Sequence, residues 1–265
     1  RKCSALCHLS VAILERRPKI ADLGFLGRPF NAIWVHLFSD ACQTPQRSLC
    51  VCDDADLEQA AHASLAGCYI NAGQNCVASE RLLVQDSIYD RFESRVAELV
   101  GSFRQGDGRS GVVDVGAIVT PLQLDLIEKA VEGAIAAGAR LVTGGKRVMS
   151  DSGDYFEPTI LADVTQDMAI AREEVFGPVM LLMRFSDDAE AISIANSVSY
   201  GLSSSVFSKD RKRARAIVAE LEAGMSAIND FGGITYMAQD LTFGGVKASG
   251  FGRMNGREGL HSMCN

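Results

Sequence analysis

Helix-like and strand-like patterns alternate along the chain from about residue 50 onward, and this alternation constrains the fold most. A helical pattern opens at Asp53 and is broken at Gly73, and the short apolar run Arg81–Gln85 follows it. The same alternation continues to residue 229. Alternating helices and strands typically build a sheet covered by helices. The sequence therefore predicts an α/β fold with a mostly parallel sheet flanked by helices.

Capping residues and apolar runs place the expected elements. Thr120, Pro121 and Gln123 form an N-cap, a first-turn proline and a capping-box glutamine, and Asp86 and Ser208 are further expected N-caps. Strands are expected at 81–85, 140–143, 155–161, 179–185, 203–208 and 225–229.

Residues 1–49 lack this order. They show no sustained period of 2 or 3.6, and cysteine, arginine and proline are scattered through them. We therefore expect 1–49 to be a disordered segment or one that does not belong to the family of the rest of the chain, and 50–265 to be one folded domain. Because the chain starts at Arg1 rather than at methionine, we also expect a fragment or processed product.

Charge and cysteine usage exclude several classes of protein. A net charge of −7 disfavours nucleic acid and anionic membranes as partners, and the basic run 209–213 is expected to be a solvated helix face. The apolar run 32–38 is too short to cross a bilayer. The eight cysteines lack disulfide spacing, so we expect a reducing intracellular compartment, by default the cytoplasm. Cys50-Val51-Cys52 lacks a second ligand pair, so no metal is expected.

Cys76 stands out among the cysteines because it lies on a tight connection between a helix end and a strand. In such a place the backbone amides of the following turn can face the sulfur and stabilise a thiolate or an oxyanion. The competing interpretation is a small buried apolar side chain. The surroundings of Cys76 favour a nucleophile.

Three segments carry a resemblance to a known family. They are Tyr69–Glu80, which contains Gly73-Gln74-Asn75-Cys76, then Glu173–Val179 with its Phe-Gly-Pro, and the glycine-rich Phe243–Arg253. In this order and spacing, residues from about 50 to 262 resemble the catalytic domain of the NAD(P)-dependent aldehyde dehydrogenase superfamily. The run 227–231 with Tyr236 and Met237 most resembles its family twenty-two group.

The resemblance implies oxidation of a small-molecule aldehyde to a carboxylate with NAD or NADP, in a homo-oligomer. Cys76 would be the nucleophile, its own backbone amide helping to hold the oxyanion. Glu174 would receive the nicotinamide ribose hydroxyls, and Phe176 would pack beside the cofactor. The alternatives are an exposed loop glutamate and a core aromatic residue.

Two further residues are candidates for the pocket or for a structural role. Asn229 ends a strand and could contribute to the active-site floor, or it could be an ordinary turn residue, and Phe231 follows closely. The glycine-rich segment does not match a dinucleotide-binding pattern. By resemblance it would be a loop that shapes the substrate entrance and packs against a neighbouring subunit.

The chain also departs from the family. Residues 1–49 resemble no part of the family's upstream cofactor-binding domain, and Cys42 stands where the family's water-activating glutamate is expected. Losing a general base costs about 10²- to 10⁴-fold in rate. The sequence thus leaves two alternatives open: a catalytically impaired fragment that acts only as a folded or associating domain, and cofactor-independent ester cleavage by Cys76.

Overall fold

A seven-stranded sheet forms the centre of the computed structural model, which describes residues 48–109, 111–151, 153–232, 238–262 and 264. The expectations for residues 1–47, Cys42 included, and for Tyr236 and Met237 lie outside these ranges. The strand order is β10-β9-β1-β2-β7-β6-β3. All neighbouring strands pair in parallel except β3 with β6. The predicted α/β fold with a mostly parallel sheet is confirmed.

The strands of this sheet are β1 (Ser48–Val51), β2 (Arg81–Gln85), β3 (Arg140–Thr143), β6 (Thr159–Ala162), β7 (Val179–Phe185), β9 (Ser203–Phe207) and β10 (Met225–Ile228). The α-helices are α3 (Leu57–Tyr69), α4 (Tyr89–Val100), α5 (Pro121–Ala136), α6 (Asp188–Asn196), α7 (Arg211–Glu220) and α9 (Gly256–Ser262). Two small ribbons pair β4 (Arg147–Ser150) with β5 (Gly153–Phe156) and β8 (Tyr200–Gly201) with β11 (Val246–Lys247). Short 3₁₀ turns are η2 (Ile70–Gly73), η3 (Asp86–Ile88) and η4 (Ala169–Ala171).

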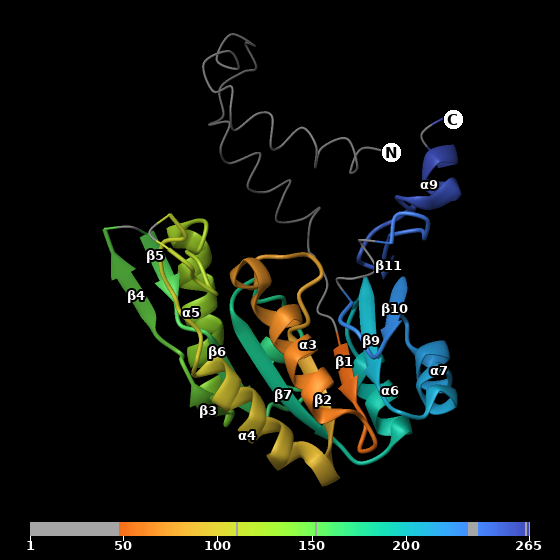
Figure 1. Ribbon diagram of the computed structural model, residues 1–265, viewed down its shortest axis with the longest axis horizontal. Coiled ribbons are helices and arrows are strands. Elements are labelled where there is room, and N and C mark those ends of the chain that lie inside the picture. Colours follow the sequence, from red (N-terminus) through yellow and green to blue (C-terminus); the bar gives the residue numbers. More distant parts are fainter. Residues whose placement is uncertain (1–47, 110, 152, 233–237, 263, 265) are drawn as a thin grey trace. The chain divides into compact units, whose positions relative to one another are not determined.

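Helices cover both faces of the sheet (Figure 1). Helix α3 connects β1 to β2 and packs with α4. Helix α6 packs against β7 and α7, and α7 packs against β9 and β10. All residues of β1, β6 and β9 are buried. Strands covered on both faces are expected to be nearly continuously apolar, as β7 is, whereas β9 begins with three buried serines. Because β1 begins at Ser48, the sheet includes two residues from before the expected boundary at 50.

One predicted strand was wrong. The pattern at 155–161 predicts a single strand, but Glu157 and Pro158 divide it into β5 and β6. Proline cannot donate a ladder hydrogen bond, so the pairing breaks there. Strand β6 joins the main sheet, while β5 pairs with β4, a strand that the sequence did not reveal.

Two predicted helix starts were also wrong. Asp86 opens the 3₁₀ turn η3, and α4 begins only at Tyr89. Helix α7 is capped by Asp210, whose carboxylate accepts from the amides of Lys212 and Arg213. Ser208 instead donates its hydroxyl to Asp54 at 2.8 Å. The cap of α5 is as predicted, with Thr120 Oγ1 accepting from the amide of Gln123.

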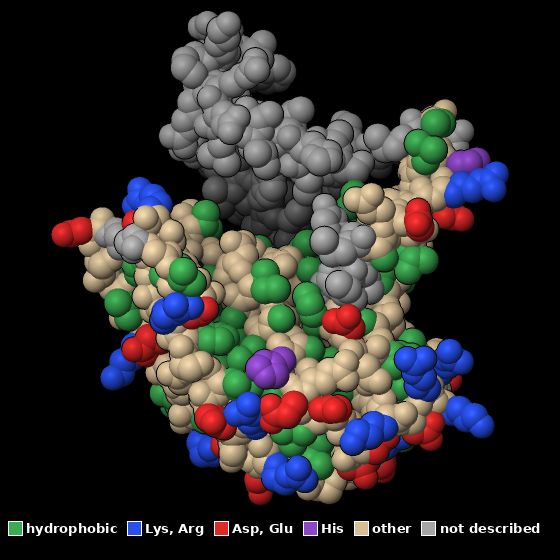
Figure 2. Space-filling view, viewed as in Figure 1, with side chains coloured by type: hydrophobic (Ala, Val, Ile, Leu, Met, Phe, Trp, Pro, Cys, Tyr) green, Lys and Arg blue, Asp and Glu red, His purple; other side chains and the backbone are tan. Residues whose placement is uncertain are grey.

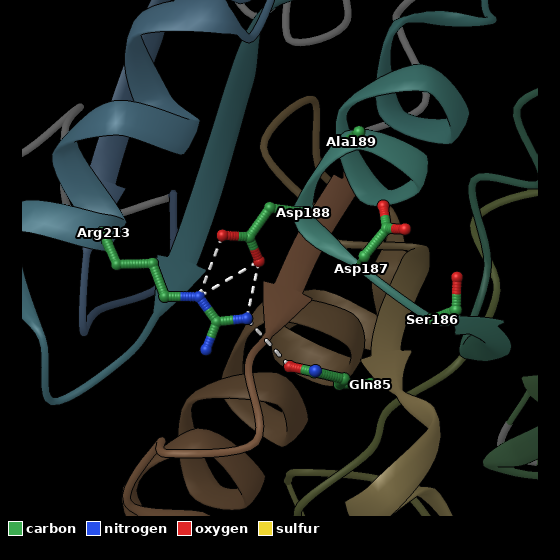
Figure 3. A pocket seen from close by; sticks show the side chains of 6 residues that line it. All are labelled: Gln85, Ser186, Asp187, Asp188, Ala189 and Arg213. Carbon is green, nitrogen blue, oxygen red and sulfur yellow. Dashed lines mark hydrogen bonds and ion pairs between the residues drawn. The ribbon is translucent and has the colours of Figure 1, made fainter.

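Arg213 lies in a polar pocket at the carboxyl ends of the strands (Figure 3). Its guanidinium bonds Asp188 at 3.0 Å, Asp53 at 2.6 Å and the side-chain oxygen of Gln85 at 3.0 Å. The basic run 209–213 is therefore not wholly a solvated face, since Arg213 turns inward and joins three elements. These ion pairs give the pocket a structural role. It lies at the C-terminal end of β2, whereas Cys76 lies before the N-terminal end of that strand.

Charged side chains of both signs are interspersed over the lower part of the face shown in Figure 2. Many belong to ion pairs, such as Arg95 with Glu58 and Arg140 with Glu93. None of the helices within the described ranges has the length and apolar content needed to cross a bilayer.

Candidate active site

The loop that carries Cys76 is pressed against the loop that carries Gly177. Asn71, Ala72 and Gly73 all have positive φ, and a Cβ atom on Gly73 would lie 2.0 Å from the carbonyl oxygen of Gly177. Such a distance is far inside van der Waals contact, so only glycine fits here. The first and second family-like segments thus meet backbone to backbone.

A tight turn built by Asn75 presents Cys76. The side-chain oxygen of Asn75 accepts from the amide of Val77 at 3.0 Å, and its carbonyl accepts from the amide of Ala78 at 2.9 Å. An asparagine that bonds an amide two residues on makes an Asx turn. The sequence predicts that these following amides face the sulfur, and in the structure both of them donate to Asn75.

Cys76 is exposed, unlike the thiols in the core. Cys50, Cys52 and Cys68 are buried. Burial raises the pKa of Cys50 and of Cys52 to about 12, and it raises that of Cys68 well above its usual range. Buried thiols in apolar surroundings are inert, because only the thiolate is nucleophilic.

Alkylation should therefore divide these cysteines into two groups. In the native chain at pH 8, iodoacetamide is expected to modify Cys76 and Cys264, which are both exposed, and to leave Cys50, Cys52 and Cys68 unmodified. Raising the pH to 10 should not change this pattern, because the pKa values of Cys50 and Cys52 are raised to about 12 and both thiols stay largely protonated at pH 10. Peptide mass mapping measures the result, and fast modification of Cys50 in folded protein would contradict it.

Gln74 ties the cysteine loop to the segment that precedes α5. Its side-chain oxygen accepts from the amide of Val119 at 2.7 Å, and its side-chain nitrogen donates to the carbonyl of Ala117 at 3.1 Å. One amide side chain therefore satisfies groups of a loop more than 40 residues away. The turn around Cys76 is held from its N-terminal side by this bridge.

The second segment turns sharply at Phe176, which is half-buried with a φ of +48°. The carboxylate of Glu80 accepts from the amides of Phe176 and Val175 at 2.8 and 3.2 Å. The side chain of Gln123 donates to the carbonyls of the same two residues at 3.3 and 2.9 Å. Gln123 was predicted as a capping-box glutamine, but its side chain serves this turn instead.

Glu174 is half-buried and lies near Tyr200 of β8. Burial raises the pKa of Tyr200, and the neighbouring carboxylates of Glu174 and Glu173 raise it further. Strand β8 pairs with β11, which belongs to the third family-like segment. The strand that carries Tyr200 is thus paired with the third segment.

The third segment also packs against the first. Phe243 forms a small buried cluster with Val77, Leu202 and Met225, and Val77 directly follows Cys76. Lys247 donates to the carbonyls of Asn196 and Val198 at 2.8 and 2.9 Å, at the C-terminal end of α6. All three segments therefore converge around the loop of Cys76.

Of the two further pocket candidates, Phe231 lies near the cysteine segment, whereas the side chain of Asn229 bonds to Ser208. A Cβ atom on Gly67 would lie 3.6 Å from that of Phe231 and 3.1 Å from that of Ser79, so Phe231 approaches the cysteine segment. The Asn229 amide group accepts from the amide of Ser208 and donates to its carbonyl, both at 2.9 Å. This favours the structural alternative for Asn229, which joins the ends of β9 and β10.

The convergence of these segments agrees with a comparison against known families, in which residues 46–265 match the aldehyde dehydrogenase family. The chain belongs to this family. Its resemblance to the family twenty-two group stays a prediction.

Several aldehyde dehydrogenases are similar to this chain. It is 44% identical over 209 residues to a betaine aldehyde dehydrogenase of Cereibacter sphaeroides, covering 79% of this chain and 42% of that protein. It is 39% identical over 215 residues to an NADP(+) succinate-semialdehyde dehydrogenase of Mycobacterium avium, covering 81% and 45%. A crystal structure of betaine aldehyde dehydrogenase from Staphylococcus aureus in complex with NAD+ matches with a TM-score of 0.76 and 38% identity, covering 82% and 43%. The chain spans less than half the length of these relatives.

The described residues of this aldehyde dehydrogenase chain fit one end of a nicotinamide nucleotide. Glu174 offers a carboxylate, which can accept hydrogen bonds from both hydroxyls of a ribose, and Phe176 offers an aromatic ring on an adjoining turn. Within the described ranges, no strand leads through a G-x-G-x-x-G loop into a helix that could receive a diphosphate. The same ranges hold no group of three His, Cys, Asp or Glu side chains suited to a metal ion.

Proposed function

We propose that this chain forms the catalytic part of an enzyme that oxidises an aldehyde to a carboxylate with NAD+ or NADP+, using Cys76 as the nucleophile. The observation that carries this proposal is the meeting of an exposed Cys76 loop with the turn that bears Glu174 and Phe176. Similarity to relatives named as betaine aldehyde and succinate-semialdehyde dehydrogenases supports it.

The chemistry begins with the sulfur of Cys76. Its thiolate forms a bond to the aldehyde carbon, the carbonyl π electrons move to oxygen, and a thiohemiacetal results. The backbone amide of Cys76 would stabilise the oxyanion, since the amides of Val77 and Ala78 serve Asn75. When bound, NAD(P)+ supplies a hydride acceptor, so that loss of hydride from this carbon leaves a thioester on Cys76. Water then adds to the thioester carbon, the sulfur departs and the carboxylate product leaves.

Glu174 and Phe176 orient the hydride acceptor in this proposal. The Glu174 carboxylate would bind the ribose hydroxyls next to the nicotinamide, and the Phe176 ring would limit how far that ring can tilt. The strained turn at Phe176 fits this task, because unfavourable backbone conformations persist where the surroundings fix them and they concentrate at functional sites.

Hydrolysis of the thioester is the step that we expect to be slow. The sequence places Cys42 where the family's water-activating glutamate is expected. Loss of a general base slows a step by about 10²- to 10⁴-fold. The acyl group should therefore accumulate on Cys76 after one hydride transfer.

This expectation gives a burst experiment. Rapid mixing of the chain with an aldehyde and NAD+ or NADP+ should give at most one equivalent of reduced nucleotide quickly, followed by turnover roughly 10²-fold slower or more. Reduced-nucleotide absorbance measures both phases. Absence of a burst together with absence of nucleotide binding by calorimetry would favour the alternative, a non-catalytic fragment of the family.

Subunit association is a further part of the proposal, as the family resemblance implies a homo-oligomer. Large exposed apolar side chains, among them Leu122, Leu126 and Met149, are compatible with a contact surface. Sedimentation at several concentrations would reveal the association.

A further inference from the structure

Glu80 is a buried carboxylate that the proposed chemistry does not use. It closes the first family-like segment, and it is only 3% exposed. Burying a carboxylate is costly unless hydrogen bonds compensate for lost water. The described contacts of its two oxygens are the amides of Phe176 and Val175, at 2.8 and 3.2 Å. A buried carboxyl group in the cysteine segment therefore holds two successive amides of the second segment.

The turn that Glu80 holds is one that Phe176 would not adopt by itself. A bulky residue at a φ of +48° is a conformational outlier, which persists only when its surroundings enforce it. Glu80 fixes the amide side of this turn, and Gln123 fixes the carbonyl side. The Gly73 contact with Gly177 seats the same turn against the Cys76 loop.

We propose that Glu80 is a positioning residue that sets the left-handed turn at Phe176 and thereby the placement of Glu174 for the nucleotide. This inference rests on the proposed function for its role in nucleotide binding. Its structural part stands independently, because it concerns only the amides of Val175 and Phe176. A carboxylate suits the task because both of its oxygens accept hydrogen bonds. The NH₂ group of an amide side chain would instead face one of the two backbone N–H groups, and two donors cannot pair.

The test compares Glu80→Gln with the intact chain in three measurements. Hydrogen exchange should accelerate in the peptide that covers residues 174–177 and stay unchanged elsewhere. NAD+ affinity by calorimetry should fall about ten- to hundredfold, because losing a hydrogen bond to a charged group has an effect of this size. The rate at which iodoacetamide alkylates Cys76 should stay as in the intact chain, because Glu80 positions the nucleotide side of the site.

Two other variants complete the experiment. Glu132→Gln, an exposed carboxyl on α5, is the matched control and should change none of the three measurements. Gln123→Leu removes the carbonyl side of the clamp and should reproduce the local exchange and the affinity loss. If Glu80→Gln does not fold, Gln123→Leu shows whether the held turn at Phe176 governs NAD+ affinity.

The outcomes separate the two claims. Unchanged exchange in 174–177, or faster exchange with unchanged NAD+ affinity, overturns the role of Glu80. If the intact chain binds neither NAD+ nor NADP+, the proposed function fails, and the structural part of the inference is then decided by the exchange measurement alone.

Discussion

Replacing Cys76 by alanine is expected to lower the formation of reduced nucleotide from an aldehyde by roughly 10³-fold or more, because the proposed covalent intermediate forms on its sulfur. The same variant should lose cleavage of p-nitrophenyl esters, a reaction that needs an activated thiol but no nucleotide. Initial rates with each substrate measure the two effects. Because Cys76 is exposed, its replacement should leave the melting temperature nearly unchanged.

Cys264→Ala is the matched control, since Cys264 is an exposed thiol outside the three converging segments. It should retain both activities of the intact chain. If ester cleavage persisted in Cys76→Ala and disappeared in Cys264→Ala, Cys264 rather than Cys76 would be the nucleophile.

Replacing Gly73 by alanine is expected to lower the free energy of unfolding by about 2–4 kcal/mol. The new Cβ would lie 2.0 Å from the carbonyl oxygen of Gly177 and 3.0 Å from that of Cys68, and both are backbone atoms that cannot rotate away. The φ of +71° adds a conformational cost for any residue with a side chain. Chemical denaturation followed by circular dichroism measures the change.

Gly133→Ala provides the opposite control. Gly133 lies inside α5, and a Cβ atom there would meet nothing within 4 Å. Alanine is the better helix former, so this variant should be more stable by about 0.5–1 kcal/mol. Equal unfolding midpoints for the two variants would show that the close contact of Gly73 with Gly177 does not exist in solution.

Local signals explain why much of the fold could be predicted. Strands β2, β3 and β7 lie where their apolar runs predict them, and α5 begins at its predicted cap. Capping residues and apolar runs involve only a few neighbouring residues, so the amino-acid sequence alone reveals them. The β4–β5 ribbon could not be predicted in this way, because both strands are short and without clear alternation and β4 is largely exposed.

The candidate site was predictable to a smaller extent. The resemblance singled out Cys76, Glu174 and Phe176, and the structure brings their loops together. The parts played by Glu80 and Gln123 depend on partners 95 and 52 residues away, which no local pattern reveals. One signal was available for Glu80, since a charged residue directly before a buried strand needs a partner.

Aldehyde oxidation by the proposed route leaves an acyl group on Cys76, and peptide mapping can detect that group. The chain is incubated with a simple aldehyde and NAD+, or with NADP+ in parallel, quenched in acid and digested for mass spectrometry. We expect the mass of one acyl group on the peptide that contains Cys76, formed only when nucleotide and aldehyde are both present. An unmodified Cys76 peptide under conditions that acylate a full-length aldehyde dehydrogenase, or an acyl group on another cysteine, would contradict it.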